Sequence, residues 1–209
     1  AMSLFHNVGG GNFENVTAKA ALDASVHGIA CTAGDYDNDG FSDLAVTSKD
    51  AVILLHNEHN GTFKNVAVSS GIKGGCCLAG VTFVDYDHDG DLDLYVASRS
   101  GSLSQRETGN SRMWRNNGDG TFTDVTEETG LGGNSGANSA IGTDYNNDRA
   151  IDLFVTSGAP EILENPREGK FKERRLWPDQ VRNSPTGVSI LDFDHDGWMD
   201  FALTFYTSE

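Results

Sequence analysis

The chain lacks a long apolar run and has few cysteines, and each lack excludes a class of protein. No stretch of 18 or more apolar residues occurs, so we expect no membrane-spanning helix. The three cysteines, Cys31, Cys76 and Cys77, form no CxxC or Cys/His pattern typical of zinc sites. A disulfide to Cys31 is one alternative, but small buried side chains are the favoured interpretation.

Basic residues are also scarce. Lys and Arg number 15 against 31 Asp and Glu, which gives a net charge of −16. Such a surface repels phosphates, so we expect no nucleic-acid partner. About half of the acidic residues fall in four short loops, and four Ca²⁺ ions would change −16 to −8. The charge therefore indicates a capacity for metal ions and not a diffuse acidic surface.

The four acidic loops share the pattern Asp-x-Asp/Asn-x-Asp-x-x-x-Asp, at residues 35–43, 85–93, 144–152 and 192–200. A second pattern, Asn-x-x-x-Gly-x-Phe, begins at Asn7, Asn57, Asn116 and Asn165. The distances from each Asn to the next loop are 28, 28, 28 and 27 residues, which predicts a tandem repeat. The distances from loop to Asn are 22, 31 and 21, so about nine residues are inserted near 99–112. We expect a surface loop there that could carry specificity.

Each unit reads as four short antiparallel strands. Apolar, β-rich segments follow the loops at 44–47, 94–97, 153–156 and 201–204, and the second pattern predicts a hairpin. Four antiparallel strands in about 50 residues are typical of a propeller blade. The sequence thus predicts an all-β fold, a β-propeller of four-stranded antiparallel blades, in one domain over 1–209. The expected parts are a half-blade at 4–17, blades at 28–67, 78–126 and 137–175, and a half-blade at 186–205.

The two half-blades add up to a fourth blade, and pairing them would remove exposed strand edges. A closed four-bladed ring, a homodimer with eight blades and a piece of a larger propeller are the alternatives. The opening Ala1-Met2-Ser3 has no signal-peptide pattern and suggests an internal fragment. The lack of a targeting segment therefore says little about location.

The loop pattern predicts calcium, because Ca²⁺ takes six to eight oxygen ligands and tolerates a flexible shell. Positions 1, 3, 5 and 9 offer side-chain oxygens, Gly at position 6 permits a sharp turn, and position 7 offers its carbonyl. The predicted ligands are Asp35, Asp37, Asp39, Phe41 and Asp43; Asp85, Asp87, Asp89, Asp91 and Asp93; Asp144, Asn146, Asp148, Ala150 and Asp152; and Asp192, Asp194, Asp196, Trp198 and Asp200.

Three rival interpretations of the loops are weaker. An EF-hand needs Glu at position 12, where this chain has Val46, Val96, Val155 and Leu203. Acidic turns without metal would crowd carboxylates that repel one another. Mg²⁺ demands a stricter octahedral geometry. We therefore expect up to four Ca²⁺ ions.

The third loop departs from the pattern. Asn146 removes one charge, and Arg149 replaces the Gly found at position 6 of the other loops. Arg strains the backbone there and brings a positive charge towards the ion. We expect the third site to be the weakest.

The loop DYDNDGFSDLAV, the hairpin pattern and the segment DVTEETGL resemble the FG-GAP/VCBS repeat family, known from integrin alpha-subunits. In form they are closest to repeats found with ASPIC/UnbV domains and in cartilage acidic protein. The resemblance covers essentially the whole chain and implies a β-propeller with Ca²⁺ between the first two strands of each blade. It also implies an extracellular or periplasmic protein with a role in adhesion or ligand binding. Arg149 and the small blade count, against about seven blades in relatives, are the departures.

Three functions follow as hypotheses. The first is a non-enzymatic, calcium-stabilised module that presents protein or carbohydrate sites on a propeller face. Trp114, Trp177 and Trp198 could stack on sugars, as in lectin propellers, or pack between blades. The second is a polysaccharide lyase or hydrolase, which the sequence disfavours because no acid–base pair stands out from the metal loops. The third is an architectural fragment that oligomerises into a closed ring.

Overall fold

The computed structural model describes residues 1–99, 109–133, 136–167, 169–176 and 185–205. Within these residues the chain forms three four-stranded sheets and two hairpins, each an antiparallel meander. The predicted all-β fold of four-stranded antiparallel blades is therefore confirmed. The strands are β1 (Phe5–Gly9) and β2 (Asn12–Asn15); β3 (Ala30–Gly34), β4 (Asp43–Thr47), β5 (Val52–Asn57) and β6 (Phe63–Asn65); β7 (Leu78–Val84), β8 (Asp93–Ser98), β9 (Arg112–Asn116) and β10 (Phe122–Asp124); β11 (Ser139–Thr143), β12 (Asp152–Thr156), β13 (Pro160–Glu164) and β14 (Lys172–Arg174); and β15 (Pro185–Leu191) and β16 (Asp200–Phe205).

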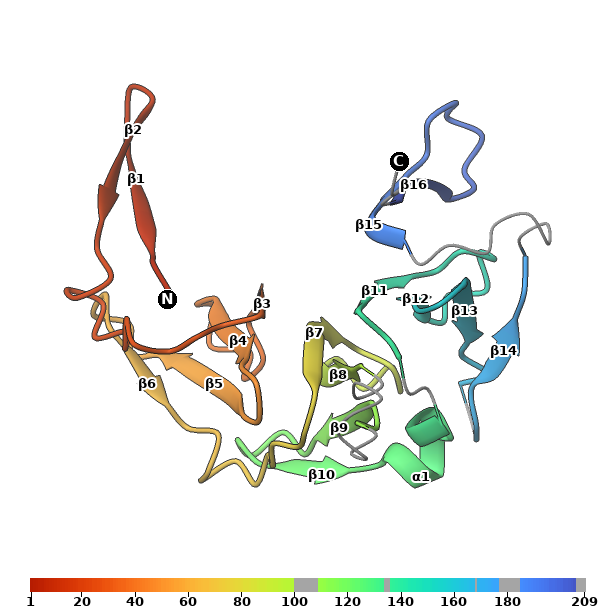
Figure 1. Ribbon diagram of the computed structural model, residues 1–209, viewed down its shortest axis with the longest axis horizontal. Helices are drawn as coiled ribbons and strands as arrows, with labels where there is room; N and C mark the ends of the chain where they lie inside the picture. The colour runs from red at the N-terminus through yellow and green to blue at the C-terminus, as the bar shows by residue number, and fades with distance from the viewer. Residues whose placement is uncertain (100–108, 134–135, 168, 177–184, 206–209) are drawn as a thin grey trace.

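The sheets stand side by side along an arc (Figure 1). The first strands β3, β7, β11 and β15 face the hollow of the arc, and β6, β10 and β14 lie on its outside. β7 is in contact with the first strands on both sides of it, β3 and β11, whereas β15 is in contact with β12. The approach is so close at Gly80 that a Cβ there would lie 2.6 Å from the Cα of Ser139. Between β10 and β11 the chain makes one helical turn, α1 (Thr126–Thr129), and one 3-10 turn, η1 (Leu131–Gly133).

The hydrophobic core lies between the sheets. One cluster joins the first and second complete sheets and includes Tyr36, Leu94 and Trp114. Another joins the second and third complete sheets and includes Tyr95 and Leu153. The second strands β4, β8 and β12 are almost wholly buried, because neighbouring segments cover both faces. For β4 one of these covers is the chain around Leu4 and Leu22, outside any sheet. In β16, at the end of the arc, partly buried and exposed residues mix instead.

Backbone hydrogen bonds repeat this contact between sheets. In each complete sheet the Phe of the hairpin pattern donates its N–H to a carbonyl in the segment that follows the preceding hairpin. The three bonds run from Phe63 to Ala20 at 3.0 Å, from Phe122 to Ser70 at 2.8 Å and from Phe171 to Thr129 at 2.9 Å. Each complete sheet is therefore bonded to the preceding unit at the same position of the repeat.

The terminal hairpins do not complete a fourth blade with each other. β1–β2 and β15–β16 are separate two-stranded sheets, at opposite ends of the arc in Figure 1. The closed four-bladed ring, one of the alternatives above, is therefore not the arrangement of this chain. The boundaries of the single domain stay a prediction.

The cysteines form no disulfide. Cys31, on β3, is exposed, and Cys76 and Cys77 are half-buried. The interpretation as buried small side chains is wrong for Cys31, because β3 lines the open inner edge of the arc. Among the described residues, no helix has the length and apolar character needed to cross a membrane.

Candidate metal centres in the blade loops

The four acidic loops occupy one repeated place, the connection between the first and second strand of each sheet. Position 6 adopts the left-handed backbone that glycine tolerates best, with φ of 88°, 94° and 87° in Gly40, Gly90 and Gly197. Arg149 takes the same conformation at φ 69°. The strain expected for Arg at this position is therefore present in the third loop.

The first Asp of a loop folds the backbone around itself. Asp35 accepts the N–H groups of Asp39 and Gly40 at 3.1 and 2.9 Å. The same pair of bonds recurs at Asp144, with 3.0 and 2.9 Å, and at Asp192, with 3.1 and 3.0 Å. These bonds curl the backbone of the loop around its first Asp.

The last Asp of each loop opens the second strand and is deeply buried in the complete sheets. Asp93 accepts the N–H of Tyr86 at 3.0 Å and that of Asn116 at 2.8 Å. Asp43 makes the equivalent bonds at 3.3 and 2.8 Å. Burial raises the pKa of the Asp93 carboxyl to about 8 and that of Asp152 to about 6, and it also raises the pKa of Asp43. A buried carboxylate in this position gains from a cation beside it.

Three of the four loops gather such carboxylates. Ligand atoms lie within 4.8 Å of one another in the groups Asp35, Asp37 and Asp39; Asp37, Asp43 and His56; Asp85, Asp87 and Asp93; and Asp192, Asp194 and Asp200. The second loop gives the sharpest sign of a missing partner, because Oδ1 of Asp85 and Oδ1 of Asp87 are buried and accept no hydrogen bond. Burial and the neighbouring Asp89 and Asp85 raise the pKa of Asp87. These Asp-rich clusters fit a divalent cation bound by oxygen.

The third loop is arranged differently. Its three aspartates do not form such a group among the described residues. Asn146 donates to Oδ2 of Asp148 at 2.9 Å, and the guanidinium of Arg167 donates to the carbonyl of Asp148. Hydrogen bonds from the protein therefore take up oxygens that an ion would otherwise use.

Two ligand candidates that sequence reasoning missed lie beside the first loop, on the hairpin of the same sheet. Nδ1 of His56 lies 3.1 Å from Asp37 and 3.5 Å from Asp43, and Nε2 of His59 contacts Asp39. The hydrogen bond from His59 lowers the pKa of Asp39. Both histidines flank Asn57, whose N–H donates to Asp43. No local signal in the sequence indicates this contact, because the hairpin and the loop are separate segments of the chain.

The remaining predicted ligands lie apart from these groups. Among the described residues, Asp89 and Asp196 join no group of three, and Asp91 accepts a hydrogen bond from Asn38 at 2.7 Å. The position-7 side chains differ widely, since Ala150 is buried and Phe41 and Trp198 are exposed. Which of the predicted ligands hold an ion stays a prediction.

Of the three tryptophans, Trp114 is wrong as a sugar-stacking candidate, because it is 3% exposed in the core between two sheets. Trp198 is 53% exposed, and Trp177 lies outside the described residues. Residues 100–108 of the predicted insertion also lie outside them.

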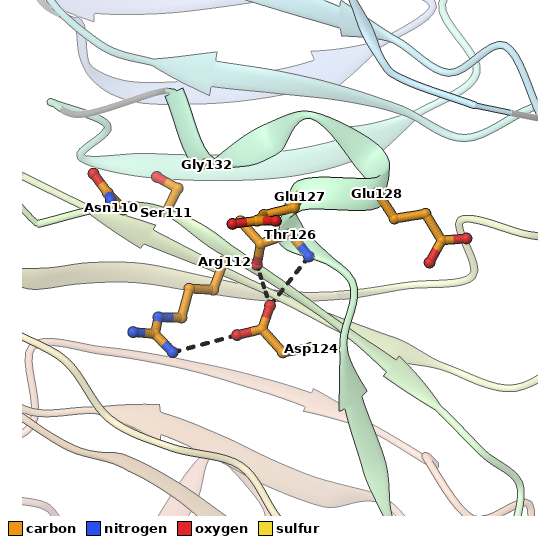
Figure 2. Close-up of a pocket in the computed structure, with 8 residues that line it drawn as sticks. All are labelled: Asn110, Ser111, Arg112, Asp124, Thr126, Glu127, Glu128 and Gly132. Carbon is orange, nitrogen blue, oxygen red and sulfur yellow. Dashed lines mark hydrogen bonds and ion pairs between the residues drawn. The ribbon is translucent and has the colours of Figure 1, made fainter.

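A polar pocket opens on the second complete sheet, and Asn110 and Ser111 are among the residues that line it. Figure 2 shows Arg112 of β9 paired with Asp124 at 3.3 Å, while Asp124 accepts both the N–H and the hydroxyl of Thr126. Glu127 and Glu128 of α1 complete the acidic side of the pocket. The Arg112 guanidinium lies 6.0 Å from the centre of the Trp114 ring.

The chain matches the FG-GAP-like repeat over residues 1–46, 35–96, 102–155 and 144–203. None of the curated proteins gives a significant match. A solved structure of an Agrocybe aegerita lectin, described as recognising non-reducing terminal N-acetylglucosamine, is similar at 15% identity and a TM-score of 0.49. The match covers 97% of this chain and 51% of the lectin chain, so this chain spans about half of that protein's length.

The family match agrees with the position of each acidic loop between the first two strands of a sheet. The four matched segments together cover nearly the whole sequence. The chain belongs to the FG-GAP-like repeat family.

Proposed function

We propose that this chain is a calcium-stabilised, non-enzymatic binding module of a secreted or periplasmic protein. The observation that carries the calcium part is the second loop, where buried oxygens of Asp85 and Asp87 have no partner beside the buried Asp93. An ion there would be held by these carboxylates and would neutralise charge that burial otherwise penalises. The third loop is expected to be the weakest site, because it contains Arg149 and its Asp148 carbonyl is bonded to Arg167.

Calcium acts as a structural clamp in this proposal. The last Asp of a loop is bonded to the hairpin of its own sheet, and Nδ2 of Asn116 and Asn165 donates at 2.7 and 2.6 Å to carbonyls of Tyr36 and Tyr86 in the preceding loops. An ion that fixes one loop therefore also fixes the carbonyl to which the next sheet is bonded. Millimolar calcium outside the cell suits such sites.

The ligand-binding role rests on the pocket of Figure 2. The pocket is lined by charged and hydroxyl side chains, among them Arg112, Thr126 and Glu128. Such a lining suits a polar ligand, either a glycan or a protein surface that carries charges of both signs. Enzymatic activity is not part of the proposal, because the carboxylates gathered in the loops are assigned to ions.

We expect glycan binding without turnover on a glycan array combined with a panel of polysaccharide substrates. Arg112→Ala should weaken binding about tenfold, since it removes the only guanidinium lining the described pocket. Arg175→Ala is the matched control, because Arg175 makes an exposed ion pair with Glu173 on another sheet. Turnover of any glycan would contradict the claim that the module is not an enzyme. Equal glycan binding by both variants would contradict the claim that this pocket holds the glycan.

A second proposal concerns the ends of the arc. Phe5, Phe13 and Phe193, three large apolar side chains on the terminal hairpins, are 58%, 64% and 70% exposed. We propose that a second copy of the chain covers them and makes an eight-bladed ring. Light scattering at rising concentration should then show a dimer that Phe13→Asp and Phe193→Asp abolish. Val68→Asp, at a 95% exposed position away from the ends, should leave the dimer intact. A strict monomer at all concentrations would exclude the dimer.

A further inference from the structure

The first loop differs from the other loops in what surrounds it. Its own sequence nearly matches that of the second loop, but the hairpin beside it contributes His56 and His59. Asp39, His56 and His59 offer ligand atoms within 4.8 Å of one another, and so do Asp37, Asp43 and His56. Two imidazoles and up to three carboxylates therefore meet at one place.

The corresponding positions of the other two complete sheets carry no such nitrogen ligands, and the first hairpin carries one of the pair, with His6 before Asn7 and Gly9 two residues after it. One residue before and two residues after the hairpin Asn stand Arg115 and Gly118 in the second complete sheet, and Glu164 and Arg167 in the third. The pair of histidines is therefore confined to one blade.

The two imidazoles are held in place from several sides. The ring of His59 stacks on Phe41 with centroids 4.2 Å apart and an angle of 16°. The ring of His56 packs edge-on to Tyr36 at 6.4 Å and lies 6.0 Å from that of His59. His59 also keeps a left-handed backbone at φ 57°, where the second complete sheet has Gly118 at φ 69°. The site is reachable from solvent, because the side chains of His56 and His59 are 24% and 45% exposed.

Ligand chemistry separates this site from the others. Ca²⁺ takes oxygen ligands, whereas Zn²⁺ and its neighbours in the first transition row favour imidazole nitrogen combined with carboxylate. We propose that the first loop is a mixed imidazole–carboxylate site for one divalent transition metal of the Zn²⁺ class, bound by Asp39, His56 and His59 with Asp37 beside them. The proposal goes beyond calcium binding and does not depend on whether the other loops take calcium.

The test measures zinc binding by competition with a chromogenic zinc chelator, in a large excess of calcium. We expect one Zn²⁺ per chain that calcium does not displace. The double variant His56→Arg/His59→Gly installs the residues of the second complete sheet and should weaken zinc binding at least about a hundredfold. Its fold should persist, because Gly suits the backbone of residue 59 better than His does.

The matched control is His88→Asn/His195→Asn. These histidines occupy position 4 of the second and fourth loops, where the first and third loops have Asn38 and Asn147. The control should bind zinc as the original chain does. Co²⁺ should give visible absorption bands of a nitrogen-ligated ion that only the His56/His59 variant loses.

Three outcomes would overturn the proposal: no zinc binding, zinc displaced by calcium at comparable concentration, or zinc binding unchanged in the His56→Arg/His59→Gly variant. The rise in melting temperature that calcium gives should persist in that variant through the second and fourth loops. Failure of the zinc site is thereby distinguished from failure of the calcium proposal.

Discussion

Asp93→Ala is expected to lower the free energy of unfolding by about 3 to 5 kcal/mol in the presence of calcium. The carboxylate is fully buried and is the acceptor for the N–H groups of Tyr86 and Asn116. Each buried donor left without an acceptor costs about 1 to 3 kcal/mol, and loss of the ion adds to this. Urea unfolding followed by circular dichroism measures the change.

Asp200→Ala is the matched control, because Asp200 holds the same loop position but is half-buried and accepts the N–H of Phe193. We expect it to lose less than half as much stability. Asp93→Asn keeps the size and one acceptor oxygen, so it provides a folded variant if the alanine does not fold. Equal losses for Asp93→Ala and Asp200→Ala would contradict the view that the buried loop ends hold the sheets together.

The second large effect is a pH dependence that appears only without metal. Burial raises the pKa of Asp93 from 3.8 to about 8 and that of Asp152 from 3.8 to about 6. Because the folded pKa exceeds the unfolded one, the stabilising contribution is fully present below about pH 4 and is lost as the pH rises through the folded pKa. Thermal unfolding should therefore show that metal-free protein loses stability between about pH 5 and pH 8.

Calcium should reverse this trend, because protons and calcium compete for the same oxygens. Asp39 and Glu164, whose pKa values are lowered by His59 and Arg174, act in the opposite sense only near and below pH 4. Asp39 and Glu164 therefore do not change the loss of stability expected between about pH 5 and pH 8. Metal-free stability that stays flat or rises from about pH 5 to pH 8 would contradict the role assigned to the buried aspartates.

The sequence predicted the strand order and the loop positions well, because both follow from local spacing. Each loop pattern lies between two short apolar segments, and the structure places it between the first two strands of a sheet. The left-handed backbone of Arg149 at position 6 of the third loop was predictable for the same reason, since a backbone angle is a local property.

What the sequence did not reveal depends on contacts between segments. Nothing local indicates that Nδ2 of Asn116 reaches the carbonyl of Tyr36, 80 residues earlier, or that His56 and His59 close over the first loop. Trp114 could be placed in the core only once the neighbouring sheet was known to cover it. The half-blades were misleading in one respect, because two halves that add up to one repeat unit need not pair within one chain.

The most direct test of the account is the melting temperature of metal-free protein with and without millimolar calcium, near neutral pH. An ion at ten to a hundred times its Kd stabilises by roughly 1.4 to 2.7 kcal/mol per site. Filling of the first, second and fourth loops, with a transition metal excluded, should therefore raise the melting temperature by about 10 °C or more. A chelator should reverse the rise. An unchanged melting temperature after chelation would contradict the claim that calcium clamps these blades.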